Sequence, residues 1–271
     1  MDSTILFLPE LILIASILAV PAIYIATNST KSYSICSNIS LAVSLLVVIL
    51  FWYSPDSVSF DKSSSSYVIY DHFVINDFSQ LFKVIFLLSA LAVSIISSSY
   101  FKEDEPHQAE YYVLLLSSAL GMLITASAND FLTIFVGIEL SAFSSYGLVA
   151  FRKTDDKSTE AGAKYLLIGA FSSALTLYGI SLLYALTGSV TFEGVNAFLT
   201  GIDNGVIDGD FNELIFISSL FIIAGLLSVV IGTFMAVRQF KIKRFIAYSS
   251  ITHMGYMLLF LSAFTFVSLQ Y

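Results

Sequence analysis

Charged residues that stand alone in long apolar stretches are the part of this sequence most able to do chemistry. Glu139 is the strongest case, because it follows Asp130 by nine residues in an otherwise uncharged stretch. In a helix that starts near Asp130, Glu139 would lie ~13 Å along the axis, near the middle of a lipid bilayer. An unpaired carboxyl group at that depth binds a proton rather than staying charged, which is what a proton relay needs. The alternative is a neutral glutamate that only hydrogen-bonds to another helix.

Two lysines also fall inside apolar stretches. Lys164 follows Glu160 by four residues, and Lys83 follows Asp77 by six. They would lie ~6 Å and ~9 Å, respectively, from the starts of their helices. Either could transfer protons, but Lys164 can also pair with Glu160 one turn away, and Lys83 can extend to the nearer membrane face. Because Glu139 lies at a different depth from Lys164, a direct ion pair between those two is not expected.

His253 is the remaining candidate for proton transfer. It lies about nine residues into the last apolar stretch, and an imidazole changes charge near neutral pH. Hydroxyl groups surround it in the sequence, on Tyr248, Ser249, Ser250 and Thr252. A hydrogen bond to a neighbouring helix is an equally good interpretation of this histidine.

The elements that must position these residues are membrane-spanning helices. Of 271 residues, 57% are hydrophobic and 12% charged, whereas about a quarter are charged in a soluble domain. The apolar runs are continuous rather than alternating, which favours helices over a β-barrel. We predict an all-α bundle of about eight helices in a single membrane domain, residues 1–271. The predicted helices are Thr4–Thr27, Tyr33–Tyr53, Asp77–Tyr100, Ala109–Ser127, Asp130–Phe151, Glu160–Gly188, Glu213–Val237 and Arg244–Val267.

Basic residues are concentrated in every second connecting segment. Those after the odd-numbered predicted helices hold nine, namely Lys31, Lys102, Arg152, Lys153, Lys157, Arg238, Lys241, Lys243 and Arg244, against Lys62 alone after the even-numbered ones. The positive-inside rule therefore places the odd connections in the cytoplasm or matrix and both termini on the outer side. The two long polar connections, 54–76 and 189–212, are expected to be surface loops without regular structure.

Several classes of function are excluded by composition. The net charge of −8 argues against nucleic acid as a partner. Cys36 is the one cysteine, so this chain cannot ligate an iron–sulfur cluster or build a cysteine zinc site. No glycine-rich phosphate loop or dinucleotide motif is present. We therefore expect no cofactor and no metal on this chain, and the first apolar stretch, preceded by Met-Asp, is expected to be a retained helix rather than a signal peptide.

Three stretches resemble the antiporter-like, proton-translocating membrane subunits of respiratory complex I, and most of all NADH dehydrogenase subunit 2. They are Ile138-Glu-Leu followed by Tyr146, the run 158–173 that continues to Thr187-Gly-Ser, and Lys243-Arg-Phe-Ile-Ala-Tyr-Ser-Ser-Ile-Thr-His-Met-Gly-Tyr. The resemblance implies a fold of about fourteen helices in the full family. It matches Glu139 to the family's helix-five glutamate, Lys164 to its helix-six lysine and His253 to its helix-ten histidine.

The chain departs from this family after its sixth helix. The family has a lysine and a proline-rich broken helix there, but no Lys or Arg lies between Lys164 and Arg238, and the last proline is Pro106. The resemblance thus implies a shortened subunit that lacks helices seven and eight with their lysines.

The resemblance implies a subunit of proton-translocating NADH:ubiquinone oxidoreductase that does no redox chemistry itself. The missing lysines favour a structural role, while Glu139, Lys164 and His253 leave room for residual proton transfer; the alternative is an independent cation/proton antiporter. Expected partners are other membrane-arm subunits, lipids and a separate polypeptide that supplies the missing helices. The expected location is the mitochondrial inner membrane or, in a bacterium, the plasma membrane.

Overall fold

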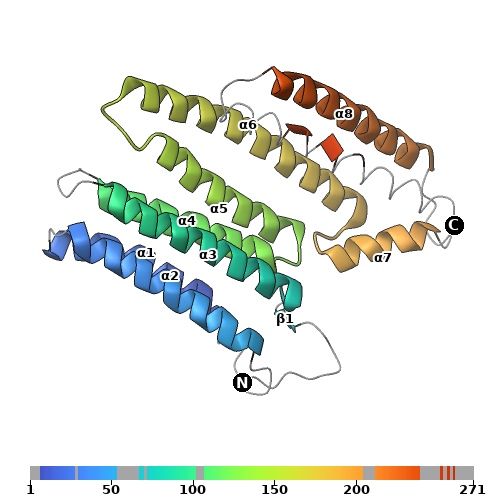
Figure 1. Cartoon of the computed structure of the whole chain (residues 1–271). Helices are drawn as coiled ribbons and strands as arrows, with labels where there is room; N and C mark the ends of the chain where they lie inside the picture. Colours follow the sequence, from blue (N-terminus) through green and yellow to red (C-terminus); the bar gives the residue numbers. More distant parts are fainter. Residues whose placement is uncertain are drawn as a thin grey trace. The chain divides into compact units, whose positions relative to one another are not determined.

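The computed structural model describes residues 7–27, 30–53, 67–69, 72–101, 107–203 and 211–238, with 251–252, 255–256 and 259. These residues fall into two compact units, Met1–Asn196 and Ala197–Tyr271. Figure 1 shows the helices that dominate the first unit.

Six long helices make up nearly all of the first unit. They are α1 (Leu8–Thr27), α2 (Thr30–Tyr53), α3 (Asp77–Tyr100), α4 (Gln108–Ser127), α5 (Phe131–Val149) and α6 (Asp156–Thr187). Each is long and apolar enough to cross a membrane. The first six predicted helices are therefore confirmed, with ends that differ by a few residues.

The helices α1 to α4 form a bundle with one buried core. α1 packs against α2 and α4, and α3 packs against the same two helices. Leu13, Leu41, Leu87 and Leu116 come from the four different helices and are completely buried. Because most of the remaining surface of these helices is apolar, the outer faces of the bundle suit lipid rather than water.

Small residues bring α4 and α5 into close contact. A Cβ atom on Gly121 would lie 2.6 Å from the carbonyl oxygen of Gly137, and one on Gly137 would lie 2.8 Å from the backbone nitrogen of Thr125. Side chains are too large for this spacing, and small residues are what lets membrane helices approach in this way. α5 is thus held against the α1–α4 bundle by backbone contact.

The two long connections contain regular structure, so the prediction of plain loops was wrong there. β1 (Tyr67–Ile69) and β2 (Phe73–Ile75) pair antiparallel, as expected for aromatic and β-branched residues around a short turn. The second connection contains α7 (Phe192–Asp203), whose apolar residues Phe192, Val195 and Phe198 recur at helical spacing. We call the end of the first unit that carries β1 and β2 the hairpin end, and the end with Arg152 and Lys153 the basic end.

The described part of the second unit consists mainly of α8 (Phe211–Val237). A Cβ atom on Gly225 would lie 3.0 Å from the backbone oxygen of Gly255, so α8 closely approaches the helical residues around 255. This agrees with the seventh predicted helix. The eighth, Arg244–Val267, lies mostly outside the described residues, although 251–252, 255–256 and 259 are helical.

Candidate functional site

Glu139 lies halfway along α5, as its spacing from Asp130 predicted. α5 starts at Phe131 because Asp130 caps it, accepting a hydrogen bond from the backbone N–H of Thr133 at 2.7 Å. The Glu139 side chain turns toward α6, where the hydroxyl of Ser173 donates a hydrogen bond to Oε1. In the described part of the chain no Lys, Arg or His pairs with this carboxyl group.

The seam between α5 and α6 continues from Glu139 toward the basic end. Tyr146, two turns further along α5, is buried and its hydroxyl occupies the space beside Gly169 of α6. Its ring meets that of Tyr165 edge-on, with centroids 4.7 Å apart. A carboxyl group and two hydroxyls on one seam can hold a proton and pass it over a short distance.

Lys164 is not part of this seam. Its ammonium group donates a hydrogen bond to Glu160 one turn earlier on α6, and both side chains are more than 60% exposed in this chain. Ser173, the partner of Glu139, follows Lys164 by nine residues, or ~13 Å along the helix. The expected absence of a direct Glu139–Lys164 pair agrees with this geometry. His253 lies outside the described residues.

Lys83 does not extend to the membrane face, so the simpler interpretation given above was wrong. Its side chain is 2% exposed, and its ammonium lies 2.7 Å from Oε1 of Glu10 on α1. The core tolerates this buried ammonium group because the carboxylate paired with it offsets part of the free-energy cost of removing the charge from water. Glu10 was not among the residues predicted from the sequence, although it is a lone carboxylate in an apolar stretch, like Glu139.

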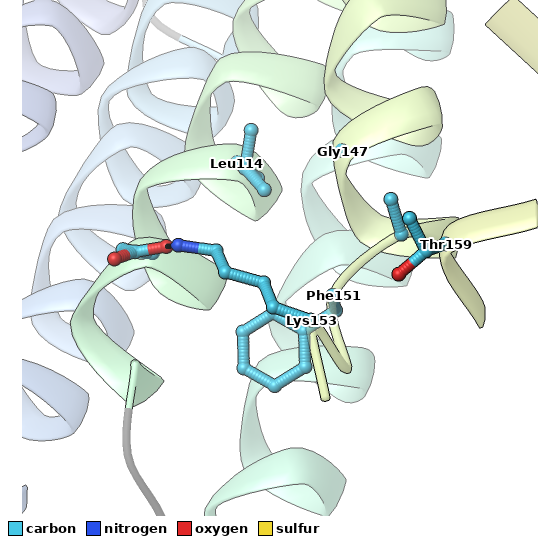
Figure 2. Close-up of a pocket in the computed structure, with 7 residues that line it drawn as sticks. Leu114, Gly147, Phe151, Lys153 and Thr159 are labelled. Carbon is cyan, nitrogen blue, oxygen red and sulfur yellow. Dashed lines mark hydrogen bonds and ion pairs between the residues drawn. The ribbon is translucent and has the colours of Figure 1, made fainter. Parts of the chain in front are cut away.

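A pocket of about 360 Å³ opens at the basic end. It is lined by Glu110, Leu114, Gly147, Ala150, Phe151, Lys153 and Thr159. Figure 2 shows the extended Lys153 side chain at this pocket, and its ammonium group lies 2.6 Å from the carboxylate of Glu110. Gly147 follows Glu139 by eight residues, so the pocket lies ~12 Å from Glu139 along α5. It is a recess in the basic end that does not include the Glu139 carboxyl group.

A buried carboxylate joins several segments at the hairpin end. Asp130 is fully buried and accepts hydrogen bonds from Thr133 and, at 2.9 Å, from Nδ1 of His72. Neighbouring backbone bonds link Asn129 to His72 and to Phe192. Burial favours the neutral acid, but the hydrogen bonds from Thr133 and His72 outweigh it and hold the pKa of Asp130 below its ordinary value of 3.8.

These features define a multi-pass membrane protein: six helices in the described part of the chain are long and apolar enough to cross a membrane, and one of them carries a glutamate at its middle. Residues 128–208 and 206–271 both match the family described as NADH:quinone oxidoreductase/Mrp antiporter, transmembrane. Together these matches take in more than half of the chain, so the chain belongs to this family.

Curated relatives point to one branch of the family. The chain is 29% identical over 323 residues to NADH-quinone oxidoreductase subunit N of Erythrobacter litoralis, covering 98% of this chain and 65% of that protein. It is 35% identical over 190 residues to subunit N of Methylobacterium nodulans, covering 69% and 38%. The chain thus spans less than two thirds of the length of these relatives.

Solved structures share the fold. Respiratory complex I from Thermus thermophilus contains a chain that matches with a TM-score of 0.66 at 24% identity, over 94% of this chain and 64% of that one. The archaeal membrane-bound sulfane sulfur reductase matches with a TM-score of 0.69 at 20% identity, over 96% and 65%.

The alignments also locate part of the difference in length. The alignment with the Erythrobacter litoralis protein is 323 residues long, which is 52 more than the 271 residues of this whole chain. At least that many positions therefore have no counterpart here. The two family matches meet at residues 206–208, which favours a gap between α7 and α8, where the sequence predicted one.

Proposed function

We propose that the chain is the antiporter-like membrane subunit of a proton-translocating NADH:quinone oxidoreductase, called subunit 2 or subunit N. The observation that carries this proposal is the family match over 128–271, together with Glu139 in the middle of α5 and turned toward α6. In this role the chain would be embedded in the membrane arm, and electrons from NADH to quinone would pass through other subunits.

The subunit serves mainly to build and seal the membrane arm. Between Lys164 and Arg238 the sequence contains no Lys or Arg, and Lys164 is engaged with Glu160. Glu139, Lys164 and His253 remain as local proton-binding groups. From Glu139 toward the hairpin end, the next polar side chain of α5 is Thr133, ~9 Å away, and Thr133 already bonds Asp130. This spacing supports a subunit without its own path for protons across the membrane.

Partners follow from this role. Neighbouring membrane-arm subunits and lipids would cover the exposed apolar faces of α5 and α6, where Val136, Phe143, Leu167 and Phe171 are more than half exposed. A separate polypeptide would supply the helices that this chain lacks. The relatives named above are bacterial, which favours a bacterial plasma membrane over the mitochondrial inner membrane.

The basic end faces the cytoplasm in this proposal, because of its excess of Lys and Arg. A single cysteine introduced at Thr154, in a Cys36→Ser background, should react with an impermeant maleimide only after sealed cells are opened. A cysteine at Ser65 should react in intact cells. The reverse labelling pattern would overturn the orientation.

Isolation of the native particle tests the proposed function. An affinity tag on this chain should recover, in mild detergent, a particle many times heavier than the 29.7 kDa chain that oxidises NADH and reduces quinone. Recovery of the chain alone or as a small oligomer, without NADH oxidation, would contradict the proposal.

A cation/proton antiporter is the second candidate, because the matching family includes Mrp antiporters. The same isolation separates the two functions. An antiporter would instead appear as a small particle that moves cations against a proton gradient in reconstituted vesicles.

A further inference from the structure

A buried ion pair crosses the α1–α4 bundle, on helices other than the two that form the Glu139 seam. Glu10 of α1 and Lys83 of α3 meet at 2.7 Å, with side chains 8% and 2% exposed. α1 and α3 each pack on α2 and α4, so the long lysine side chain spans the interior between them. Ser44 of α2 also reaches this point and donates a hydrogen bond to the backbone oxygen of Pro9 at 3.2 Å.

One oxygen atom of the pair and one oxygen atom of a nearby side chain lack hydrogen-bond partners among the described residues. Oε2 of Glu10 and Oε1 of Gln80 are both buried and have no hydrogen-bond partner among the described residues. Gln80 precedes Lys83 by three residues and so shares its helix face. Buried carboxylate and amide oxygens are almost always hydrogen-bonded, and where protein groups do not serve them, ordered water does.

Closely packed apolar side chains lie next to the pair on the side of the basic end. Leu13 follows Glu10 by three residues and Leu87 follows Lys83 by four, which places them ~5 Å and ~6 Å further along their helices. Both are completely buried, as is Leu116 of α4. These side chains leave no room for water to approach the pair from the basic end.

We propose that Glu10 and Lys83 form a hydrated proton-exchange site, open to the hairpin end of the α1–α4 bundle. A proton from water binds Oε2 of Glu10 and gives a neutral acid beside the Lys83 ammonium. The ammonium releases one proton to the same water, and the acid then passes its own proton to the amine. One proton enters, one leaves and the ion pair is restored. The site does not include Glu139. The proposal applies whether the chain is an oxidoreductase subunit or an antiporter.

Infrared difference spectroscopy between acid and neutral pH tests the site in the purified full chain in lipid nanodiscs. We expect a carbonyl band of a protonated carboxyl group that shifts in D₂O and is absent from Glu10→Gln. Glu160→Gln is the matched control, because Glu160 also pairs with a lysine but is exposed, and this variant should keep the band. A Glu10→Gln spectrum identical to wild type, or a Glu10 band that does not shift in D₂O, would overturn the proposal.

The double variant E10M/K83M keeps the test decisive if Glu10→Gln does not fold. Loss of one partner leaves a buried unpaired charge, whereas replacing both partners with apolar residues is tolerated far better. The folded double variant should lack the same band. If the band persists in E10M/K83M, it comes from another carboxyl group and the proposal fails.

Discussion

Gly121→Ala should strongly destabilise the packing of α4 against α5. The new Cβ atom would lie 2.6 Å from the carbonyl oxygen of Gly137 and 2.7 Å from the backbone nitrogen of Ser141. Backbone atoms cannot rotate away as a side chain can, so α5 must move outward. We expect a loss of roughly 3 kcal/mol, at the upper end for overpacked cores, measured by reversible unfolding of the chain in mixed micelles.

Gly179→Ala is the matched control, because no atom lies within 4 Å of a Cβ atom built there. Alanine also favours a helix more than glycine does, so this variant should be as stable as wild type or slightly more so. If the two variants lost stability equally, the close contact between α4 and α5 would not be what holds α5 in place.

Asp130→Ala should also cause a large loss of stability, because the carboxylate accepts three hydrogen bonds. The variant loses the cap on α5, the bond from the Thr133 hydroxyl and the bond from His72. Together these are worth roughly 2–4 kcal/mol for a buried, charge-assisted group. Asp155→Ala removes the exposed cap of α6 and should cost only about 0.5–1 kcal/mol. Equal losses in the same micelle assay would show that Asp130 acts as a simple cap.

The effect of Asp130 should also depend on pH. Its pKa in the folded chain lies below its ordinary value of 3.8, so its contribution is complete above pH 3.8 and is lost as the pH falls through the lower folded-state pKa. Wild type should therefore lose stability more steeply than Asp130→Asn in that acid range. Parallel curves for the two proteins would contradict this linkage.

The sequence predicts the spanning helices well because lipid imposes long apolar runs on them. Glu139 could be placed near the middle of α5 from its distance to Asp130 alone. The partner of Lys83 could not be found, since sequence spacing carries no information about which helices are neighbours across a bundle. Glu10 was nonetheless detectable as an isolated charge, and β1, β2 and α7 were missed because polar connections were assumed to lack regular structure.

The contact between Glu139 and Ser173 could not be predicted from the sequence for the same reason. Helical depth is a property of one segment, whereas the facing residue depends on how α5 and α6 pack. Tyr146 beside Gly169 sets that packing, because glycine leaves space for the phenol ring. A glycine on one helix and an aromatic residue on the next gives only a weak signal in a single sequence.

Glu139→Gln in the native particle tests the central claim, that this subunit keeps the glutamate seam but has no proton path of its own. Glutamine can still accept the hydrogen bond from Ser173 and removes only the ionisable group. We expect an intact particle that oxidises NADH at the wild-type rate and moves as many protons per NADH as wild type. An intact particle with a lower proton yield per NADH would contradict it and show that Glu139 belongs to a working pump.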